Sequence, residues 1–275
     1  MRVAITGASG LIGSRLVAEL GRRGDSVVAL TRGEPPDLSG MDGVVNLAGE
    51  PVAQRWTVAA KERIRSSRVE GTKALAAAIP EADPRPGVLV SASAAGYYGD
   101  RGAEELDEAA PPGDDFLASL CVEWERAADG ADVRVVKVRT GVVLDRAGGA
   151  LKQMLPPFRA GVGGPIAGGR QYMPWISLED IVGIYLAALS DDRWSGPVNA
   201  SAPAPATNAE FSRALGRALK RPAVIRVPAF ALKALYGEMA SVVTGGQRMV
   251  PRRALELGYE FRHPELDGAL RAALA

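Results

Sequence analysis

Short apolar runs alternate along the chain with stretches in which apolar residues recur at helical spacing. The first run, at residues 3–5, is rich in β-branched side chains and is typical of a strand buried on both faces. Glycines follow it, and then Leu16, Val17 and Leu20, whose spacing predicts a helix that ends near Gly24. The chain therefore opens with a predicted strand, a glycine-rich turn and a helix.

The same alternation continues beyond this unit. It predicts strands at 26–30, 44–47, 88–90, 133–138 and 196–200, and helices at 56–79, 115–129, 178–188 and 208–219. Ser177 and Thr207 are the predicted N-caps of the last two helices. Turn-rich residues 33–42 leave little room for a crossover helix between the second and third strands. This order favours an α/β fold with a Rossmann-type, doubly wound parallel sheet.

The pattern changes after residue 145. A short predicted helix containing Met154, Leu155 and Phe158 lies between glycine-rich loops, and two further helical segments follow Pro228. We therefore predict a dinucleotide-binding Rossmann domain at 1–145, to which residues 170–200 return. A smaller α+β substrate lobe is predicted at 146–275.

The glycine-rich turn carries the first functional signal. Gly7 permits the sharp turn out of the strand, Gly10 lets backbone N–H groups approach a pyrophosphate, and Gly13 lets the helix pack close to the sheet. The start of the helix adds unpaired N–H donors and a partial positive charge. A glycine triplet between a strand and a helix predicts dinucleotide binding, against the alternative of a plain structural turn.

The end of the second strand indicates which dinucleotide binds. A site for NAD usually carries an acidic residue there, bonded to the ribose 2′-hydroxyl. This chain has Thr31 and Arg32 instead. A guanidinium pairs well with a 2′-phosphate and a hydroxyl donates to it, which favours NADP(H). The alternative is a solvated arginine on a loop.

The composition argues against a nucleic-acid-binding, metal-binding or membrane-spanning protein. The chain has 275 residues with 47% hydrophobic content, and its 33 basic and 32 acidic side chains nearly cancel, so we expect no nucleic-acid partner. Cys121 and His263 are its single cysteine and histidine, and we predict no metal site. The strand begins at residue 2, and no apolar run reaches the roughly 18 residues of a membrane span. We therefore expect a cytoplasmic protein that does not bind membranes.

Residues 88–99 carry the second functional signal. The predicted strand ends in serines, including Ser93, and is followed by Tyr97 and Tyr98. The carboxyl end of such a strand is the catalytic edge of the sheet, where a hydroxyl can bond a substrate carbonyl or alcohol. The alternative is a polar strand end followed by two packed aromatic rings.

Several short motifs lie at the predicted ends of strands and helices: 6–13 (TGASGLIG), 46–49 (NLAG), 91–93 (SAS) with Tyr98 and Gly99, and 174–180 (PWISLED). Together they resemble the extended short-chain dehydrogenase/reductases, the NAD(P)-dependent epimerase/dehydratase family. Further motifs at 164–166, 207–211, 251–253 and 257–259 resemble a branch called "epimerase family protein", some of whose members are described as cell-division inhibitor-like. The resemblance covers essentially the whole chain, and its last segment resembles that branch's C-terminal domain of unknown function.

The resemblance implies a Rossmann-type fold and NADP(H) binding. It implies phosphate contacts from the glycine turn, 2′-phosphate contacts after the second strand, adenosine contacts after the third strand, one arginine from the following helix and one valine near the nicotinamide. In that order the residues are Gly7, Ser9, Gly10, Leu11 and Ile12; Thr31 and Arg32; Leu47, Ala48 and Gly49; Arg68; and Val143.

The chain departs from the wider family in its catalytic pair. Active members use a tyrosine and a lysine four residues later, and the lysine lowers the tyrosine pKa for proton transfer. The corresponding helix has no Tyr-x-x-x-Lys; the aligned pairs are Phe116 with Leu120, or Leu117 with Cys121. The usual serine position falls on Ser93 when counted from Tyr97, and on Ala94 when counted from Tyr98. Without a lysine we expect the phenol pKa to stay near its reference of about 10, so either tyrosine would serve as a hydrogen-bond donor rather than a base.

Two functions follow from these observations. One is an NADP(H)-dependent oxidoreductase or epimerase (an isomerase) that acts on a small carbonyl or sugar-like substrate, with Ser93, Tyr97 and Tyr98 as its catalytic residues. The other is a non-catalytic NADP(H)-binding module that reports redox state to a partner. We expect a monomer or a homodimer, because related proteins often pair through two helices.

Overall fold

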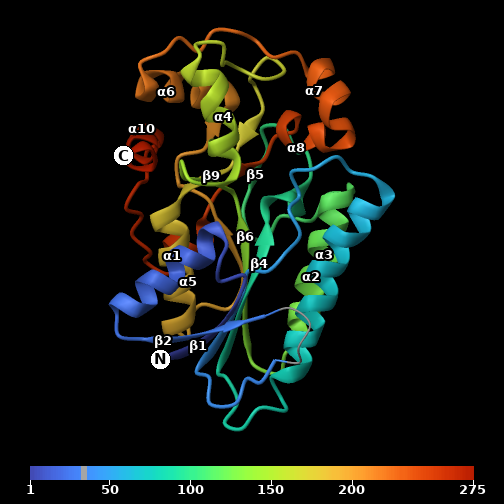
Figure 1. The fold of residues 1–275 in the computed structure, drawn as a ribbon, viewed down its shortest axis with the longest axis vertical. Helices are drawn as coiled ribbons and strands as arrows, with labels where there is room; N and C mark the ends of the chain where they lie inside the picture. The colour runs from blue at the N-terminus through green and yellow to red at the C-terminus, as the bar shows by residue number, and fades with distance from the viewer. Residues whose placement is uncertain (32–35) are drawn as a thin grey trace.

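The computed structural model describes residues 1–31 and 36–275. Its central sheet is parallel and contains β1 (Arg2–Thr6), β2 (Ser26–Leu30), β3 (Gly43–Asn46), β4 (Val88–Ala94), β6 (Arg134–Thr140) and β10 (Gly196–Ala200). The strand order is β10-β6-β4-β3-β1-β2 (Figure 1). From β1 the chain adds β2 on one side, and then β3 and the later strands on the other side, so the strand order reverses between β1 and β3. Ligands of open α/β sheets bind at this reversal, beyond the carboxyl ends of the strands. The predicted doubly wound parallel sheet is confirmed.

Helices cover both faces of the sheet. Figure 1 shows α1 (Leu11–Arg22) and α5 (Leu178–Ser190) on one side, and α2 (Val58–Ala78) and α3 (Phe116–Asp129) on the other. Apolar side chains of the strands pack against each pair of helices and form two clusters, one per face. In the connection from β2 to β3, residues 36–42 contain no helix, as their turn-rich sequence predicts.

Local side-chain bonds set where several helices begin. The Asp115 carboxylate accepts the N–H of Ala118 at the start of α3, at 2.8 Å. The Ser177 hydroxyl accepts the N–H of Asp180 at the start of α5, at 3.0 Å. Thr207 and Glu210 form a reciprocal capping box on the next helix, α6 (Asn208–Leu219). Each bond satisfies an N–H group that the helix itself leaves unpaired, and the predicted caps at Ser177 and Thr207 are confirmed.

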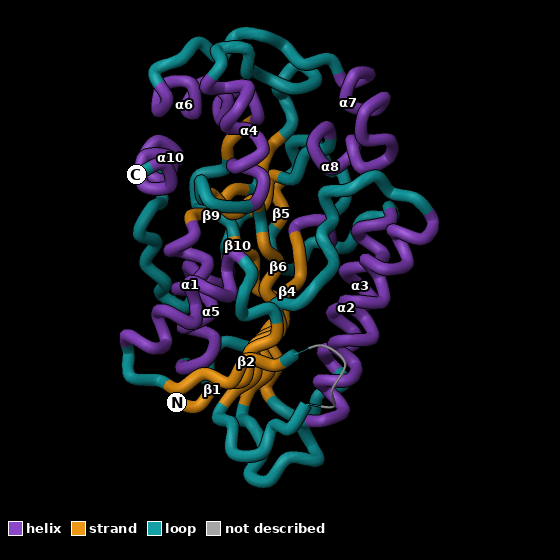
Figure 2. Tube along the Cα trace, viewed as in Figure 1, coloured by secondary structure: helices purple, strands orange, loops and turns teal. Residues whose placement is uncertain are grey.

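A group of short elements lies beyond the carboxyl end of the sheet (Figure 2). Its helices besides α6 are α4 (Gly149–Arg159), α7 (Ala229–Tyr236), α8 (Ser241–Thr244) and α10 (Leu266–Leu274). Its short strands pair as β7 (Val142–Leu144) with β9 (Trp175–Ser177), β8 (Tyr172–Met173) with β11 (Ala206–Thr207), and β5 (Glu105–Leu106) with β12 (Arg248–Met249). The helices α4, α6 and α10 share a separate apolar cluster that includes Phe158, Phe211 and Leu270.

The number of helical segments after Pro228 differs from the prediction. The structure contains α7, a 3₁₀ turn, α8, α9 (Arg252–Glu256) and α10, where two segments were expected. Glycine and proline divide this stretch: Gly237, with a φ of +63°, ends α7, Gly245 ends α8, and Pro251 precedes α9. The segments between these breaks are too short for their hydrophobic periodicity to identify separate helices.

The C-terminal segment is anchored to the sheet layer through one buried carboxylate. Asp180, on the first turn of α5, accepts the backbone N–H groups of Arg262 and His263 at 2.7 and 3.1 Å. The Tyr259 hydroxyl donates to the carbonyl of Asp180 at 2.9 Å. A buried carboxylate needs hydrogen-bond donors, so these contacts fix the segment that precedes α10.

Among the helices of the described residues, not one combines the length and the apolar character needed to cross a membrane.

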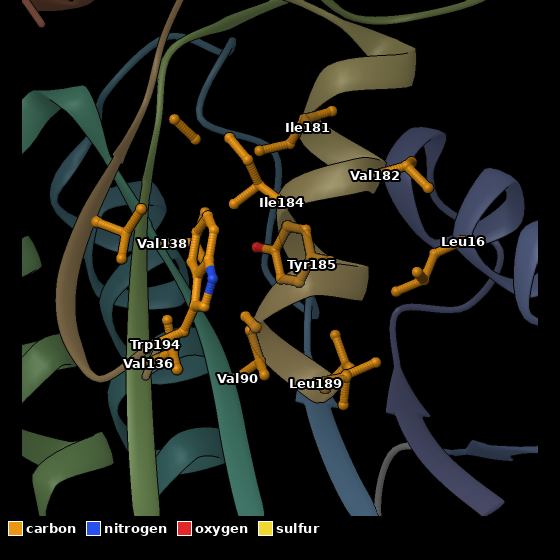
Figure 3. Close-up of a cluster of buried hydrophobic side chains, with 14 of the residues drawn as sticks. Leu16, Val90, Val136, Val138, Ile181, Val182, Ile184, Tyr185, Leu189 and Trp194 are labelled. Carbon is orange, nitrogen blue, oxygen red and sulfur yellow. The ribbon is translucent and has the colours of Figure 1, made fainter. Parts of the chain in front are cut away.

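Tyr185 of α5 offers a test of this core. Figure 3 shows it among apolar side chains of β4, β6 and α5, beside Trp194. The side chain is wholly buried, and its hydroxyl has no hydrogen-bond partner among the described residues. The Thr140 hydroxyl nearby donates instead to the carbonyl of Val138, at 3.2 Å.

We expect Tyr185→Phe to leave the free energy of unfolding within about 0.5 kcal/mol of the wild type, or to raise it, because an unpaired buried hydroxyl is removed. Tyr98→Phe is the matched comparison, since the equally buried Tyr98 donates to Asn199 Oδ1 at 2.6 Å, and we expect it to lose about 1–3 kcal/mol. Urea unfolding measures both. A larger loss for Tyr185→Phe than for Tyr98→Phe would contradict the assignment of these two hydroxyls.

Candidate functional site

The glycine turn after β1 is packed more tightly than any side chain allows. Gly7 has a φ of +70°, and a Cβ placed on it would lie 2.8 Å from the carbonyl carbon of Leu47. A Cβ on Gly13 would lie 2.2 Å from the carbonyl oxygen of Gly7. The first turn of α1 therefore packs against the turn, and the turn packs against the end of β3. This packing gives a physical reason for glycine at both positions.

The start of α1 is open to a ligand. Its N-cap is Gly10, which provides no side-chain hydrogen bond to the first turn. Ser9 and Gly10 are exposed, and Leu11 and Ile12 are half-buried. The first N–H groups of a helix carry a partial positive charge and bind phosphate well. The residues present thus fit the pyrophosphate of a dinucleotide, which agrees with the glycine signal in the sequence.

The predicted contacts with the adenosine half fall at the ends of the next two strands. Thr31 follows β2 and is exposed, whereas Arg32 lies outside the described residues. Leu47 and Ala48 follow β3, and their N–H groups both donate to the Thr6 hydroxyl, at 3.1 and 3.2 Å. These bonds hold the end of β3 against the end of β1. A Cβ on Gly49 would lie 2.8 Å from Arg68 Cζ, so the small residue there makes room for a guanidinium.

Arg68, on α2, is largely buried in this region. Its Nη1 donates to the carbonyl oxygens of Glu50 and Ile64, at 2.9 and 3.2 Å. Its guanidinium lies over the ring of Trp124, with Cζ 5.2 Å from the ring centroid. Burial lowers the pKa of Arg68, although an arginine remains charged in proteins. The structure therefore holds the Arg68 guanidinium beside Gly49, after the end of β3.

A cavity of about 780 Å³ extends from the glycine turn into the group of short elements. Val142 lines the cavity, whereas Val143 packs against the apolar core of the sheet. Four of the predicted site residues line this cavity at the carboxyl edge of the sheet. Ile12, Leu47 and Arg68 lie at one end, and Ser93 lies on the wall.

The Ser93 hydroxyl is already committed inside the protein. It donates to Glu125 Oε1 at 2.7 Å, and both side chains are buried. Glu125 in turn accepts two hydrogen bonds from Arg139, Nε to Oε1 at 2.8 Å and Nη2 to Oε2 at 2.9 Å. Because the single hydroxyl proton points to Glu125, the Ser93 oxygen has only lone pairs left for a ligand. Ser93 is thus an acceptor on the cavity wall.

Tyr98 belongs to the same buried network. Its hydroxyl accepts from Arg139 Nη1 at 3.0 Å and donates to Asn199 Oδ1 at 2.6 Å. Burial raises the pKa of Tyr98 to about 12, although Arg139 and Asn199 act in the opposite direction. The expectation of a pKa near the reference value is therefore wrong for Tyr98. Its side chain is not among the groups that line the cavity, so we assign it a structural role.

Tyr97 also contacts Arg139 rather than the cavity. The Arg139 Cζ lies 3.4 Å from the centroid of the Tyr97 ring, a cation–π contact. Of the three residues predicted to be catalytic, Ser93 alone contributes to the described cavity lining. Glu125, Arg139 and Asn199 join them, and none of these three was among the predicted site residues. The available signal was the position of Arg139 near the carboxyl end of a predicted strand, at the edge where ligands bind.

The helix that carries the proton relay in active relatives presents different side chains here. Leu117 and Cys121 of α3 line the cavity and lie four residues apart. Burial raises the pKa of the Cys121 thiol to about 12, so it is uncharged at neutral pH. Neither side chain is a proton donor or base under physiological conditions. Across residues 1–31 and 36–275, no three His, Cys, Asp or Glu side chains gather closely enough to hold a metal ion.

The close packing at Gly13 gives a direct test. We expect Gly13→Ala to lower the free energy of unfolding by about 1–3 kcal/mol, because the added methyl overlaps the carbonyl of Gly7. Gly21→Ala is the matched control on the same helix, since a Cβ placed on Gly21 would meet nothing within 4 Å. That change should raise stability by about 0.5–1 kcal/mol, the usual gain of alanine over glycine in a helix. Equal effects of the two changes, measured by urea unfolding, would contradict the packing described.

Comparisons with known proteins agree with this geometry. A model of the NAD dependent epimerase/dehydratase family matches residues 3–200, and a model of a domain of unknown function matches residues 227–273. Epimerase family protein SDR39U1 of Bos taurus is 43% identical over 294 residues, which span 100% of both chains.

Two solved structures are similar along nearly the whole chain. The crystal structure of human epimerase family protein SDR39U1 with NADPH has a TM-score of 0.94 and 40% identity, and covers 99% of each chain. A nucleoside-diphosphate sugar epimerase from Corynebacterium glutamicum has a TM-score of 0.79 and 35% identity, over 99% of this chain and 58% of that one. The resemblance noted in the sequence is confirmed: the chain belongs to the NAD dependent epimerase/dehydratase family and carries that domain of unknown function at its C-terminal end.

Proposed function

We propose that the protein binds NADPH across the carboxyl edge of its sheet and reduces or epimerises a small carbonyl or sugar-like compound. The observation that carries this proposal is the continuity of the cavity, which runs from Ile12 in the first turn of α1 and Leu47 after β3 to the wall that contains Ser93. The NADPH present in the structure of human SDR39U1 supports the choice of the phosphorylated cofactor.

Residues of the glycine turn, of the ends of β2 and β3, and of α2 and β7 would hold the cofactor. The backbone at the start of α1 fits the pyrophosphate, and the positions after β2 and β3 fit the adenosine half. The assignments are Gly7, Ser9, Gly10, Leu11 and Ile12 for the pyrophosphate; Thr31 and Arg32 for the 2′-phosphate; Leu47, Ala48 and Gly49 for the adenosine; Arg68 for a phosphate; and Val143 near the nicotinamide. When bound, NADPH supplies a hydride to the adjacent part of the cavity.

The protein's own groups decide where a proton comes from. Ser93 can accept a hydrogen bond only from a hydroxyl, of a sugar-like ligand or of the alcohol that reduction forms, because its own proton is held by Glu125. The positions of the usual tyrosine and lysine hold Phe116 with Leu120, or Leu117 with Cys121, and none of these side chains supplies a proton. A carbonyl oxygen reduced here would therefore take its proton from water, which gives slower turnover than a tyrosine donor.

The same observations favour a second candidate function, a non-catalytic NADPH-binding module. Leu117 and Cys121 line the cavity without a proton relay, and Tyr98 is sealed in the buried network. Such a protein would bind the cofactor and change its affinity for a partner without consuming it. The two functions make opposite statements about NADPH oxidation.

Turnover distinguishes them. In the presence of a panel of aldehydes and ketones, the catalytic function requires NADPH oxidation above the protein-free rate, followed by NADPH absorbance. Ser93→Ala should reduce that rate about tenfold or more, because the acceptor for the hydroxyl that forms as the carbonyl is reduced is lost. Ser91→Ala is the control: Ser91 lies two residues earlier on β4 and does not line the cavity. NADPH binding without oxidation of any panel member would favour the module.

Cofactor choice has its own test, which rests on the sequence. We expect Arg32→Ala to weaken NADPH binding by about tenfold or more while NADH binding changes little, because only NADPH presents a 2′-phosphate to the guanidinium. Calorimetric titration of wild type and variant with each nucleotide measures the two ratios. The 2′-phosphate role is wrong if both nucleotides lose affinity equally.

A further inference from the structure

The part of the cavity beyond Ser93 has an apolar wall. It is formed by side chains of α4, β8, α7 and the 3₁₀ turn that follows α7, among which Met154, Phe158, Met173, Leu232 and Met239 are prominent. These residues come from four separate segments of the chain, all beyond β6. Methionine side chains are flexible and polarizable, so they pack against apolar ligands of varied shape.

Charged side chains contribute little to this wall. Within the described chain, the cavity lining contains three of them, Arg68, Asp100 and Asp115. Arg68 is bonded to two backbone carbonyls at the cofactor end. Asp115 caps α3, and Asp100 Oδ1 accepts the N–H groups of Gly102 and Gly246, at 3.2 and 2.9 Å. Each of these charged groups already has backbone hydrogen-bond partners inside the protein.

This distribution conflicts with a nucleoside-diphosphate ligand. A diphosphate brings two negative charges, which need cationic side chains or several N–H donors when they leave water. The ligand end of the cavity supplies no cationic side chain among the described residues, and both of its acidic groups repel an anion. Two of its amide side chains, Gln171 and Gln247, already donate to backbone carbonyls. An uncharged apolar ligand meets no such penalty, and each buried methylene adds affinity.

We propose that the ligand beside the cofactor is an uncharged, mainly apolar carbonyl compound, and not a nucleoside-diphosphate sugar. The inference rests on the proposed function, and it names the substrate class of that site. The apolar wall holds the ligand, and Ser93, whose proton is given to Glu125, accepts a hydrogen bond only from the hydroxyl that forms when the carbonyl is reduced. The whole cavity measures about 780 Å³ and includes the cofactor end, so the ligand occupies only the part beyond Ser93.

A homologous series of ligands tests the apolar wall. With NADPH-saturated protein, calorimetric titration should give dissociation constants that fall from 2-pentanone to 2-heptanone to 2-nonanone. The expected gain is about fourfold per methylene, the factor equivalent to about 0.8 kcal/mol for each methylene buried. UDP-glucose, the charged comparison, should bind at least tenfold more weakly than 2-nonanone. Tighter binding of UDP-glucose, or ketone affinities that do not rise with chain length, would overturn the proposal.

Two variants of α7 locate the binding. Leu232 lines the cavity, whereas Leu235 is 64% exposed and is not part of its wall. Because α7 contains no buried residue, neither change should unfold the protein. Leu232→Asp should weaken 2-nonanone binding about tenfold or more, since it places a charge beside the ligand. Leu235→Asp should leave binding unchanged. Equal effects of the two variants would show that the ketone binds the outer surface.

Failure of the proposed function looks different from failure of this inference. NADPH is titrated first, without any ketone. If it does not bind, the cofactor site itself is wrong. If NADPH binds with wild-type affinity in both α7 variants while no ketone binds, only the substrate class is wrong.

Discussion

A buried pair of opposite charges, Glu125 of α3 and Arg139 of β6, determines how the residues around the cavity are held. Removing two ions from water costs several kcal/mol each, and only close, multiple hydrogen bonds offset that cost. The two bonds between them, with Ser93 and Tyr98 as further partners, satisfy this condition. Loss of either ion would leave the other unpaired, so helix and strand have one stable register. Ser93 and Tyr98 are therefore oriented by the fold, whether or not a ligand is bound.

The features that the sequence predicts well are those set by neighbours along the chain. The caps at Ser177 and Thr207 are predictable because each side chain bonds an N–H group three residues away. The glycine turn is predictable because Gly7 needs a positive φ and Gly13 meets the backbone of Gly7 itself. Both signals are local, and they extend to the sheet because strands and helices alternate regularly.

The features that the sequence does not predict depend on contacts between residues far apart in the chain. Glu125 looks like any charged helical residue, and its pairing with Arg139 depends on how α3 lies on the sheet. Tyr98 follows a strand end, as a catalytic tyrosine would, but Asn199, about a hundred residues later, binds its hydroxyl. The cavity wall is formed by segments far apart in the sequence, so no single pattern identifies it. The two ends of the cavity thus differ in their residues: the cofactor end lies beside the closely packed glycine turn, and the other end is lined mainly by flexible apolar side chains.

The absence of any buried residue in α7 has a consequence for the history of the protein. Stability in a folded chain comes mainly from buried contacts, and α7 shares in almost none of the cores that support the sheet. Substitutions of Leu232 and Tyr236, which line the cavity, would change its wall without removing a buried side chain from the scaffold. Ligand specificity and folding stability therefore depend on different parts of this molecule. Related proteins could change the ligand that they bind without changing the core that supports the sheet.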